Sequence, residues 1–309
     1  DALHLAYILA GLQPGDEVIT PVFTCTATTI PFLYMGVHFK FADVDPQTLN
    51  INVAHVRSLV TEKTKAIVCV HYGGLPCDMD ELHAIAHEYN IPVIEDAAHA
   101  LGATYKGKKI GSISPFTMYS FQAIKHITTG DGGMLVIQDP SLVAKAERIR
   151  WFGIDRSNKQ KGTWENDIWE VGYKYQMTDI GAAMGLAALE EFEHTLQHRQ
   201  ELFQAYTRGL KNASGIKLIG ADATDRTHAA WLCTALVENR EHFMKYLREN
   251  KIESGQVHYR NDRYSILGGR RSDLPYMDQV EENYIVLPLN NHLKIHQIDY
   301  ICEVIRKGW

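Results

Sequence analysis

Four side chains that suit one kind of chemistry lie close together within residues 91–136. A carboxylate, Asp96, ends a short apolar run, and His99 follows three residues later. A hydroxyl, Ser120, lies at the end of a second apolar run, and Lys125 comes between it and the glycine-rich stretch TTGDGG. This inventory suits a pyridoxal phosphate site, because a lysine amine can form a Schiff base and a carboxylate can keep a pyridine nitrogen protonated. A nearby hydroxyl can help to hold the phosphate.

The same residues also have ordinary structural explanations. An aspartate after a buried strand is common in α/β proteins, where it serves as the end of the strand or as the N-cap of the next helix. Lys125 could equally be a solvated surface lysine. From residue types and spacing alone, both interpretations remain open.

Two longer motifs resemble those of the nucleotide-sugar aminotransferase family, a branch of the fold-type I pyridoxal phosphate enzymes. That family carries an EDAA-x-x-x-GA segment, matched here from Glu95, and an SF-x-x-x-K…TTG[DE]GG segment, matched here from Ser120. The resemblance implies that Asp96 pairs with the protonated ring nitrogen and that His99 lies beside the ring. It also implies that Ser120 binds phosphate and that Lys125 forms the Schiff base and then moves a proton. Dehydratase members of the family carry histidine in place of this lysine, so Lys125 favours transamination.

The resemblance implies four further cofactor-binding positions. The family has a Gly-Thr pair before its first helix, where free N–H groups and the helix dipole hold the phosphate. Only Asp1 and Ala2 represent that site here, and we expect a segment to precede Asp1. Cys25 stands where the family often has an aromatic side chain on the ring, although a buried packing cysteine is the alternative. Lys174 replaces an asparagine that reaches the partner subunit's phosphate, and a solvated lysine explains it equally well.

Four residues are expected to face the substrate. His71 ends a predicted strand and could line the pocket, although a structural histidine is as good an explanation. His258, Tyr259 and Arg260 belong to a segment, VHYRNDRYS, that resembles the part of the family approaching the sugar. An arginine can pair with a nucleotide diphosphate or with the carboxylate of glutamate. A structural role for His258 also stays open.

The elements that must position these residues follow an α/β pattern. Runs such as AIVCV and IPVIE are apolar on both faces and alternate with helical stripes, which predicts a mostly parallel sheet. Ligands of such sheets bind beyond the carboxyl ends of the strands, where Asp96 would lie. By resemblance we expect a three-layer α/β/α architecture of fold-type I. A large domain over residues 1–195 would be followed by a smaller α+β domain over residues 196–309.

Apolar residues at helical spacing also predict one long helix joining the two domains. Its buried face would be formed by Leu189, Phe192, Leu196, Phe203, Tyr206 and Leu210. The glycines of the chain do not match the pattern GxGxxG, so a nicotinamide dinucleotide fold is not expected.

Composition excludes several classes of protein. The 309 residues carry a formal charge of only −6 and contain no basic run, so we expect no nucleic-acid partner. No apolar stretch approaches the roughly 20 residues that span a bilayer, so no membrane association is expected. The five cysteines are scattered without CxxC spacing, which predicts reduced thiols in the cytoplasm rather than disulfides or a metal site.

These observations lead to one predicted function with three alternatives. The resemblance implies a homodimer with shared active sites that moves an amino group from L-glutamate to a keto group of a nucleotide-linked deoxysugar. The cofactor would be pyridoxal 5′-phosphate. The alternatives are an aminotransferase acting on a cyclitol or another ketone, a sugar dehydratase of the same family, and a regulatory or scaffold protein without catalysis.

Overall fold

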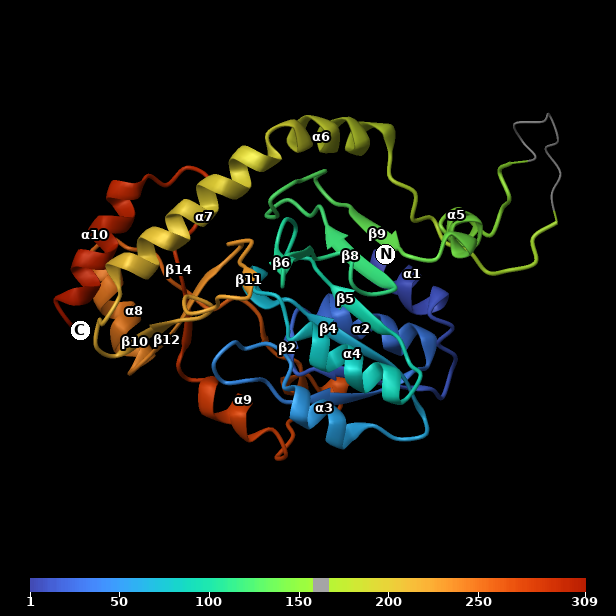
Figure 1. Cartoon of the computed structure of the whole chain (residues 1–309), viewed down its shortest axis with the longest axis horizontal. Helices are drawn as coiled ribbons and strands as arrows, with labels where there is room; N and C mark the ends of the chain where they lie inside the picture. The colour runs from blue at the N-terminus through green and yellow to red at the C-terminus, as the bar shows by residue number, and fades with distance from the viewer. Residues whose placement is uncertain (158–166) are drawn as a thin grey trace.

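A six-stranded sheet forms the centre of the computed structural model, which describes residues 1–157 and 167–309 (Figure 1). The strands lie in the order β3-β1-β4-β5-β8-β9. Their bounds are Glu17–Pro21 for β1, His38–Ala42 for β3, Thr64–Val70 for β4, Val93–Asp96 for β5, Phe116–Ser120 for β8 and Gly133–Ile137 for β9. Neighbouring strands from β3 to β8 run parallel, and β9 runs antiparallel to β8. The prediction of a mostly parallel sheet is therefore confirmed.

Helices cover both faces of this sheet. One face packs against α1 (Ala2–Leu9), α2 (Thr26–Met35) and α5 (Val143–Ile149), and the other against α3 (Val53–Leu59) and α4 (Met79–Glu88). In β4, Ala66 and Val68 belong to the first apolar cluster, whereas Ile67 and Cys69 belong to the second. Successive side chains of a strand point to opposite faces, so these runs are apolar throughout because both faces are buried. This is the predicted three-layer α/β/α arrangement.

The C-terminal part builds a smaller antiparallel sheet with helices on it. The sheet has the order β10-β12-β14, with bounds Ile216–Leu218, Cys233–Val237 and Tyr284–Leu287. It shares an apolar cluster with α7 (Phe192–Gly209), α8 (Arg240–Glu249) and α10 (Ile295–Arg306). The predicted boundary between residues 195 and 196 stays a prediction, since α7 runs across it without interruption.

Short elements connect the two parts. A two-stranded ribbon pairs β2 (Phe23–Thr24) with β13 (Tyr259–Arg260). A second small sheet joins β6 (Thr104–Tyr105) to β7 (Lys108–Lys109) and to β11 (Arg226–Thr227). Helix α9 (Pro275–Val280) completes this region.

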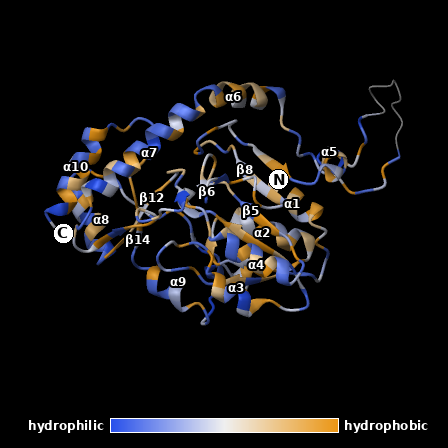
Figure 2. Cartoon of the chain, viewed as in Figure 1, coloured by the Kyte–Doolittle hydropathy of each residue, from blue (hydrophilic) through white to orange (hydrophobic). Residues whose placement is uncertain are grey.

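The predicted long helix is confirmed as α7, which buries Phe192, Leu196, Phe203 and Tyr206, but it does not include Leu189, which belongs to a separate helix. Helix α6 (Asp179–Glu190) ends just before Glu191, and α7 begins just after it. Leu189 is 56% exposed rather than buried. Other large apolar side chains of α6 are exposed as well. Figure 2 shows hydrophobic residues along this helix, which lies at the edge of the molecule. None of the helices in the described parts of the chain has the length and apolar character needed to cross a membrane.

Candidate active site

The parallel strands bring several predicted residues to one edge of the sheet. Asp96 is the last residue of β5 and Ser120 the last of β8, and the two strands run in the same direction. The loop after β5 carries His99, and the loop after β8 carries Lys125. Their common edge follows from strand direction alone, since the carboxyl ends of parallel strands meet on one side.

Asp96 is a buried carboxylate whose two oxygens are both held. Thr28 of α2 donates a hydrogen bond from its hydroxyl to Oδ2 over 2.7 Å, and the backbone N–H of Ala98 donates to Oδ1 over 3.1 Å. Tyr7 fixes Thr28 in turn, through a bond from its hydroxyl to the Thr28 carbonyl over 2.9 Å. Burial raises the pKa of Asp96, although Thr28, Ala98 and the charge of Lys125 work against this. Among the described residues, no cationic side chain forms an ion pair with this carboxylate.

Lys125 is half-buried next to aromatic and acidic groups. Its Nζ lies 3.6 Å from the ring centroid of Trp231. Burial lowers the pKa of the Lys125 amine to about 8, while Asp96 and Cys25 raise it. An amine with this pKa is partly uncharged near neutral pH and can therefore act as a nucleophile or as a base.

Two histidines and a tryptophan form a stack beside this lysine. The His99 ring lies 3.8 Å from that of Trp231 and 5.2 Å from that of His258, in nearly parallel planes. The backbone N–H of Gly73 donates to Nδ1 of His99 over 3.2 Å, so the proton of His99 is on Nε2, which lies 3.3 Å from Nε2 of His258. Burial lowers the pKa of His99 well below its usual range and that of His258 to about 4. Both rings are therefore neutral at physiological pH.

The start of α1 lies beside the end of β8. Gly133 pairs with Ser120 in the sheet, and a Cβ built on Gly133 would be 3.6 Å from the Cβ of Ala2. It would also be 2.8 Å from the carbonyl oxygen of Tyr119, so only glycine fits there. Asp1 is the N-cap residue of α1, and its side chain makes no capping hydrogen bond. The start of α1 thus lies next to the strand pair that carries Ser120, an arrangement that suits a phosphate site.

Cys25 and Tyr259 lie on neighbouring parts of the small ribbon. Cys25 is the half-buried N-cap residue of α2, directly after β2. Tyr259 pairs with Thr24 of β2, which places the 258–260 segment next to Cys25. Tyr259 is 40% exposed, and the guanidinium of Arg263 lies 4.5 Å from the centroid of its ring.

Arg260 is placed differently from what the sequence predicts. Its side chain is fully buried and donates to Asp262 over 2.6 and 2.7 Å and to Glu281 over 3.2 Å, and it also pairs with Asp278. Burial alone would lower the pKa of this guanidinium, but the three carboxylates raise it. Because the Arg260 side chain is fully buried and each of its three nitrogens is paired with a carboxylate, it is not accessible to a substrate, and it fixes the 260–281 region instead.

His71 is placed as the structural histidine that the sequence left open as one of two explanations. It is fully buried at the end of β4, and its Nε2 donates to Glu95 over 2.8 Å while its Nδ1 accepts the N–H of Cys77 over 3.1 Å. Its own backbone N–H donates to the carbonyl of Asp96. His71 therefore supports the strand that carries Asp96 and does not line a pocket.

Lys174 is exposed and lies over another aromatic ring. Its Nζ is 3.8 Å from the centroid of Trp151, with which it also forms an isolated β-bridge next to α5. Within one chain the ammonium of Lys174 thus contacts Trp151. The predicted role at the phosphate of a partner subunit stays a prediction.

One group of donors in the described residues has the composition of a metal site. The ligand atoms of Cys69, His71 and Cys77 lie within 4.8 Å of one another. All three residues are fully buried, both nitrogens of His71 are already hydrogen-bonded, and the Cys77 thiol donates to the carbonyl of Val70 over 3.2 Å. We therefore interpret the cluster as packing and hydrogen bonding beneath Asp96.

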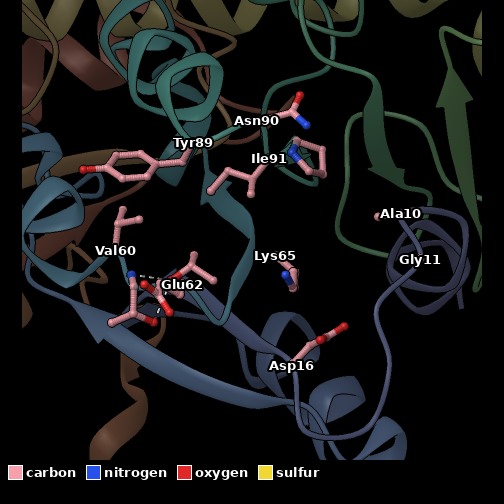
Figure 3. Close-up of a pocket in the computed structure, with 12 residues that line it drawn as sticks. Ala10, Gly11, Asp16, Val60, Glu62, Lys65, Tyr89, Asn90 and Ile91 are labelled. Atoms are coloured by element: carbon pink, nitrogen blue, oxygen red, sulfur yellow. Dashed lines mark hydrogen bonds between the residues drawn. The ribbon is translucent and has the colours of Figure 1, made fainter.

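A separate cavity of about 720 Å³ lies at the opposite edge of the sheet (Figure 3). It is lined by residues at the amino-terminal ends of β1, β4 and β5, among them Asp16, Glu62 and Lys65. None of the predicted site residues lines it, because the carboxyl ends of the parallel strands point the other way.

Sequence reasoning missed two residues that touch the predicted ones. Thr28 orients Asp96, and the AT pair within the TCTATT stretch, which resembles the family pattern, is a signal that could have found it. Trp231 contacts both Lys125 and His99. It had no signal beyond being a tryptophan in a predicted strand, because it is more than a hundred residues from Lys125.

Comparison with known proteins gives matches along the whole chain. A model of the DegT/DnrJ/EryC1/StrS aminotransferase family matches residues 1–306. GDP-perosamine synthase of Escherichia coli O157:H7 is 34% identical over 309 residues, which cover 99% of this chain and 82% of that protein. UDP-4-amino-4-deoxy-L-arabinose–oxoglutarate aminotransferase of Shewanella sediminis is 32% identical over 322 residues, covering 98% and 82% of the two chains.

Solved structures agree with these matches. Spr1654 of Streptococcus pneumoniae, a candidate sugar aminotransferase, is 31% identical to this chain and has been solved in a PMP form and a PLP form. The PMP form aligns with a TM-score of 0.90 over 99% of this chain and 84% of that one, and the PLP form with a TM-score of 0.89. The fold is therefore that of the pyridoxal phosphate-dependent sugar aminotransferases.

Proposed function

Because this chain belongs to the DegT/DnrJ/EryC1/StrS aminotransferase family, we propose that it moves an amino group from L-glutamate to a keto group of a nucleotide-linked deoxysugar. The observation that carries the proposal is that Asp96 and Lys125 meet at one edge of the sheet, close enough for the carboxylate to raise the pKa of the amine. A carboxylate and a lysine amine are the two groups that this cofactor chemistry needs.

The residues present fit pyridoxal 5′-phosphate, the cofactor of this family. Asp96 is a desolvated carboxylate that lacks a cationic partner among the described residues, and a protonated ring nitrogen would supply one. Ser120 and the first N–H groups of α1 offer donors for a phosphate. The small residues Ala97 and Ala98 leave room for a flat ring next to the backbone.

Each protein group would then have one task. When bound, pyridoxal phosphate supplies an electron sink for the carbon that loses its proton. Asp96 would keep the proton on the ring nitrogen, because Thr28 and Ala98 hold its oxygens in place. Neutral His99 would lie beside the ring, held there by the N–H of Gly73 at its Nδ1 and by His258 at its Nε2. Lys125 would bind the cofactor covalently and, once displaced by the amino donor, would move the proton as a general base and acid.

The substrates are proposed from the names of the relatives. The Shewanella sediminis relative is named for oxoglutarate, the keto acid left when glutamate gives up its amino group. The two curated relatives are named for UDP-linked and GDP-linked amino sugars, so a nucleotide diphosphate is the feature they share. We therefore propose L-glutamate as the donor and a nucleotide-linked ketosugar as the acceptor. Lys125 speaks against the dehydratase alternative, since those enzymes carry histidine there.

A homodimer with shared active sites is part of the proposal. Helix α6 exposes apolar side chains that a free surface would not favour. Only Gly181 of this helix is buried, whereas four large apolar side chains are each at least 46% exposed: Ile180, Met184, Leu186 and Leu189. A continuous group of exposed apolar side chains is characteristic of a protein interface. The same helix contacts the loop after Lys125, since a Cβ on Gly185 would be 3.0 Å from Thr129. A second copy covering α6 would thus lie close to the site.

The absorbance spectrum of the purified protein with pyridoxal phosphate tests this function. We expect a visible band from the covalently bound cofactor, which L-glutamate converts to the pyridoxamine form. Adding UDP-linked and GDP-linked 4-ketosugars separately should restore the visible band for one of them and yield an amino sugar detectable by mass spectrometry.

Two results would contradict the proposal. A visible band that L-glutamate leaves unchanged would exclude glutamate as the donor. A pyridoxamine form that nucleotide ketosugars leave unchanged, but that a ketocyclitol reoxidises, would identify the other substrate class.

A further inference from the structure

Trp231 lies between two groups of the site. Its ring is 4% exposed, with the His99 ring 3.8 Å from it at an interplanar angle of 15°. The Nζ of Lys125 lies 3.6 Å from the centroid of the same indole. A stacked ring and an ammonium group cannot both occupy one face at such distances, so Lys125 and His99 lie on opposite faces. The indole N–H also donates to the carbonyl of Ile124 over 3.0 Å, which ties Trp231 to the backbone next to Lys125.

The segment that carries Trp231 is held from several directions. The guanidinium of Arg199, on α7, donates to the carbonyls of Ala230 over 2.9 Å and of Trp231 over 2.8 Å. Nε2 of His126 donates to the carbonyl of Ala229 over 2.7 Å. Ala230 has a φ of +52°, a backbone conformation that a residue with a Cβ adopts only when its surroundings enforce it. The position of the indole is therefore fixed by contacts rather than by local preference.

An aromatic face suits a lysine that must alternate between the charged ammonium and the uncharged amine. A carboxylate in direct contact would hold the proton on the amine and keep it from acting as a base. An aromatic face attracts the ammonium more weakly than a carboxylate does, so it orients the side chain without holding the proton on the amine. Trp231 therefore provides a fixed position for the amine at little cost to its reactivity.

We propose that Trp231 is a positioning residue, which holds the free amine of Lys125 on one face of its indole and the imidazole of His99 on the other. The proposal rests on the function proposed above, because it gives Trp231 its task in the part of the reaction when Lys125 is not bound to the cofactor. It acts through these two residues and takes no part in the chemical steps itself.

The first test uses the cofactor-free protein and therefore does not depend on the identity of the substrate. The pH dependence of acetylation of Lys125 by acetic anhydride, followed by mass spectrometry of its peptide, gives the pKa of that amine. The variants are Trp231→Leu, which removes the aromatic face, and Trp231→Phe, which keeps a smaller one. The matched control is Trp309→Leu, at the C-terminal tryptophan, whose indole N–H donates to the carbonyl of Glu238 away from the site.

Loss of the aromatic face should destabilise the ammonium form of Lys125. We expect the pKa of the Lys125 amine to fall by about one pH unit in Trp231→Leu and by about half as much in Trp231→Phe. The control should match the wild type. An unchanged or raised pKa in folded Trp231→Leu, or in Trp231→Phe if the leucine variant does not fold, would overturn the proposal.

A second test uses the loaded enzyme. Trp231→Leu should lower kcat by about tenfold while KM for L-glutamate stays within about twofold, because the amine and the imidazole lose their fixed positions while the donor's binding groups remain. A change confined to KM would contradict the proposal. If the enzyme acts on a different ketone, the proposed function fails but the pKa result in the cofactor-free protein still decides the role of Trp231.

Discussion

At the scale of single residues, the site depends on charges held away from water. Asp96 is a buried carboxylate with its oxygens fixed by Thr28 and Ala98, and Lys125 is an amine whose pKa is lowered to about 8 by burial. Neither group has a conventional ion-pair partner among the described residues. Such groups are costly to bury, and their presence at one sheet edge indicates that they serve the chemistry rather than stability.

Replacing Lys125 by alanine should abolish turnover without loss of the fold. The variant loses the amine that is placed to bind the cofactor and move the proton, so we expect glutamate consumption to fall by about 10³-fold or more. Lys63→Ala, at an exposed lysine, is the control and should keep the wild-type rate. A normal rate in the Lys125→Ala variant, measured at equal thermal stability, would contradict the proposed role of Lys125.

Thr28 provides a subtler test of Asp96. Thr28→Val removes the hydroxyl that donates to Oδ2 and leaves a similar volume, so the pKa of Asp96 should rise further. We expect kcat to fall by about 10-fold to 100-fold, as for the loss of one hydrogen bond to a charged group. Thr28→Ser keeps the hydroxyl and should retain most activity. Equal rates for the valine and serine variants would show that this hydrogen bond is unimportant.

At the scale of secondary structure elements, α7 supports the site from a distance. Arg199 lies 7% exposed on this helix and donates to the carbonyls of Ala230, Trp231 and Leu289 and to the side chain of Asn291. Burial lowers the pKa of its guanidinium to about 10, and no carboxylate among the described residues compensates the charge. The helix thus holds the 228–232 segment through hydrogen bonds to backbone carbonyls and through the ring of Phe203, which stacks on His228 at 4.5 Å.

Removal of this guanidinium should therefore destabilise the protein. Arg199→Met leaves buried carbonyls without donors, and we expect the free energy of unfolding to fall by about 3 kcal/mol. Arg208→Met, at an exposed position of the same helix, should change it by less than about 0.5 kcal/mol. Urea denaturation of both variants measures the difference, and equal midpoints would mean that water replaces the lost donors.

At the scale of the whole molecule, the site is assembled from two distant parts of the chain. Asp96, His99 and Lys125 come from the parallel sheet, whereas Trp231 and His258 come from the C-terminal part. The ribbon of β2 and β13 joins the two parts next to the site. A change that separates the parallel-sheet part from the C-terminal part should therefore disrupt catalysis before it unfolds either sheet.

Neutral buried histidines make the stability of the molecule depend on pH. Burial first, and then the charge of Arg199, lower the pKa of His126 to about 3 from an ordinary 6.5. Below pH 6.5, His126 binds a proton in the unfolded chain but stays neutral in the folded chain. The free energy of unfolding should therefore fall as the pH decreases from 6.5 toward 3. His126→Gln should reduce this loss by up to about 1.4 kcal/mol for each pH unit. Urea denaturation at pH 7, 6 and 5 measures the free energy of unfolding. If it changes with pH equally in the wild type and the variant, the lowered pKa of His126 is contradicted.

The exposed face of α6 leads to a prediction about assembly. Ile180 is 77% exposed, and Ile180→Asp would place a charge in the proposed interface, where it would lose its hydration. We expect the dimer dissociation constant to rise by about 100-fold, measured by light scattering across a dilution series. Ile295→Asp, at the start of α10, should leave the dimer intact. A monomeric wild type, or a variant that dimerises as tightly, would refute an interface on α6.

Local sequence determined much of this protein. The apolar runs predicted the strands and their ends, and the alternation of strands with helices predicted a parallel sheet, which places Asp96, Ser120 and Lys125 at one edge. The mostly parallel sheet and the sugar aminotransferase family followed from the same stretches. These features need no knowledge of which distant residues meet.

Only the tertiary structure decided how those residues are surrounded. It buried Arg260 among three carboxylates, placed His71 beneath Asp96, and ended α6 one residue before α7 began. It also brought Trp231 to Lys125 across more than a hundred residues of sequence. Such contacts depend on how the two parts of the chain pack together, and residue spacing carries no record of that packing.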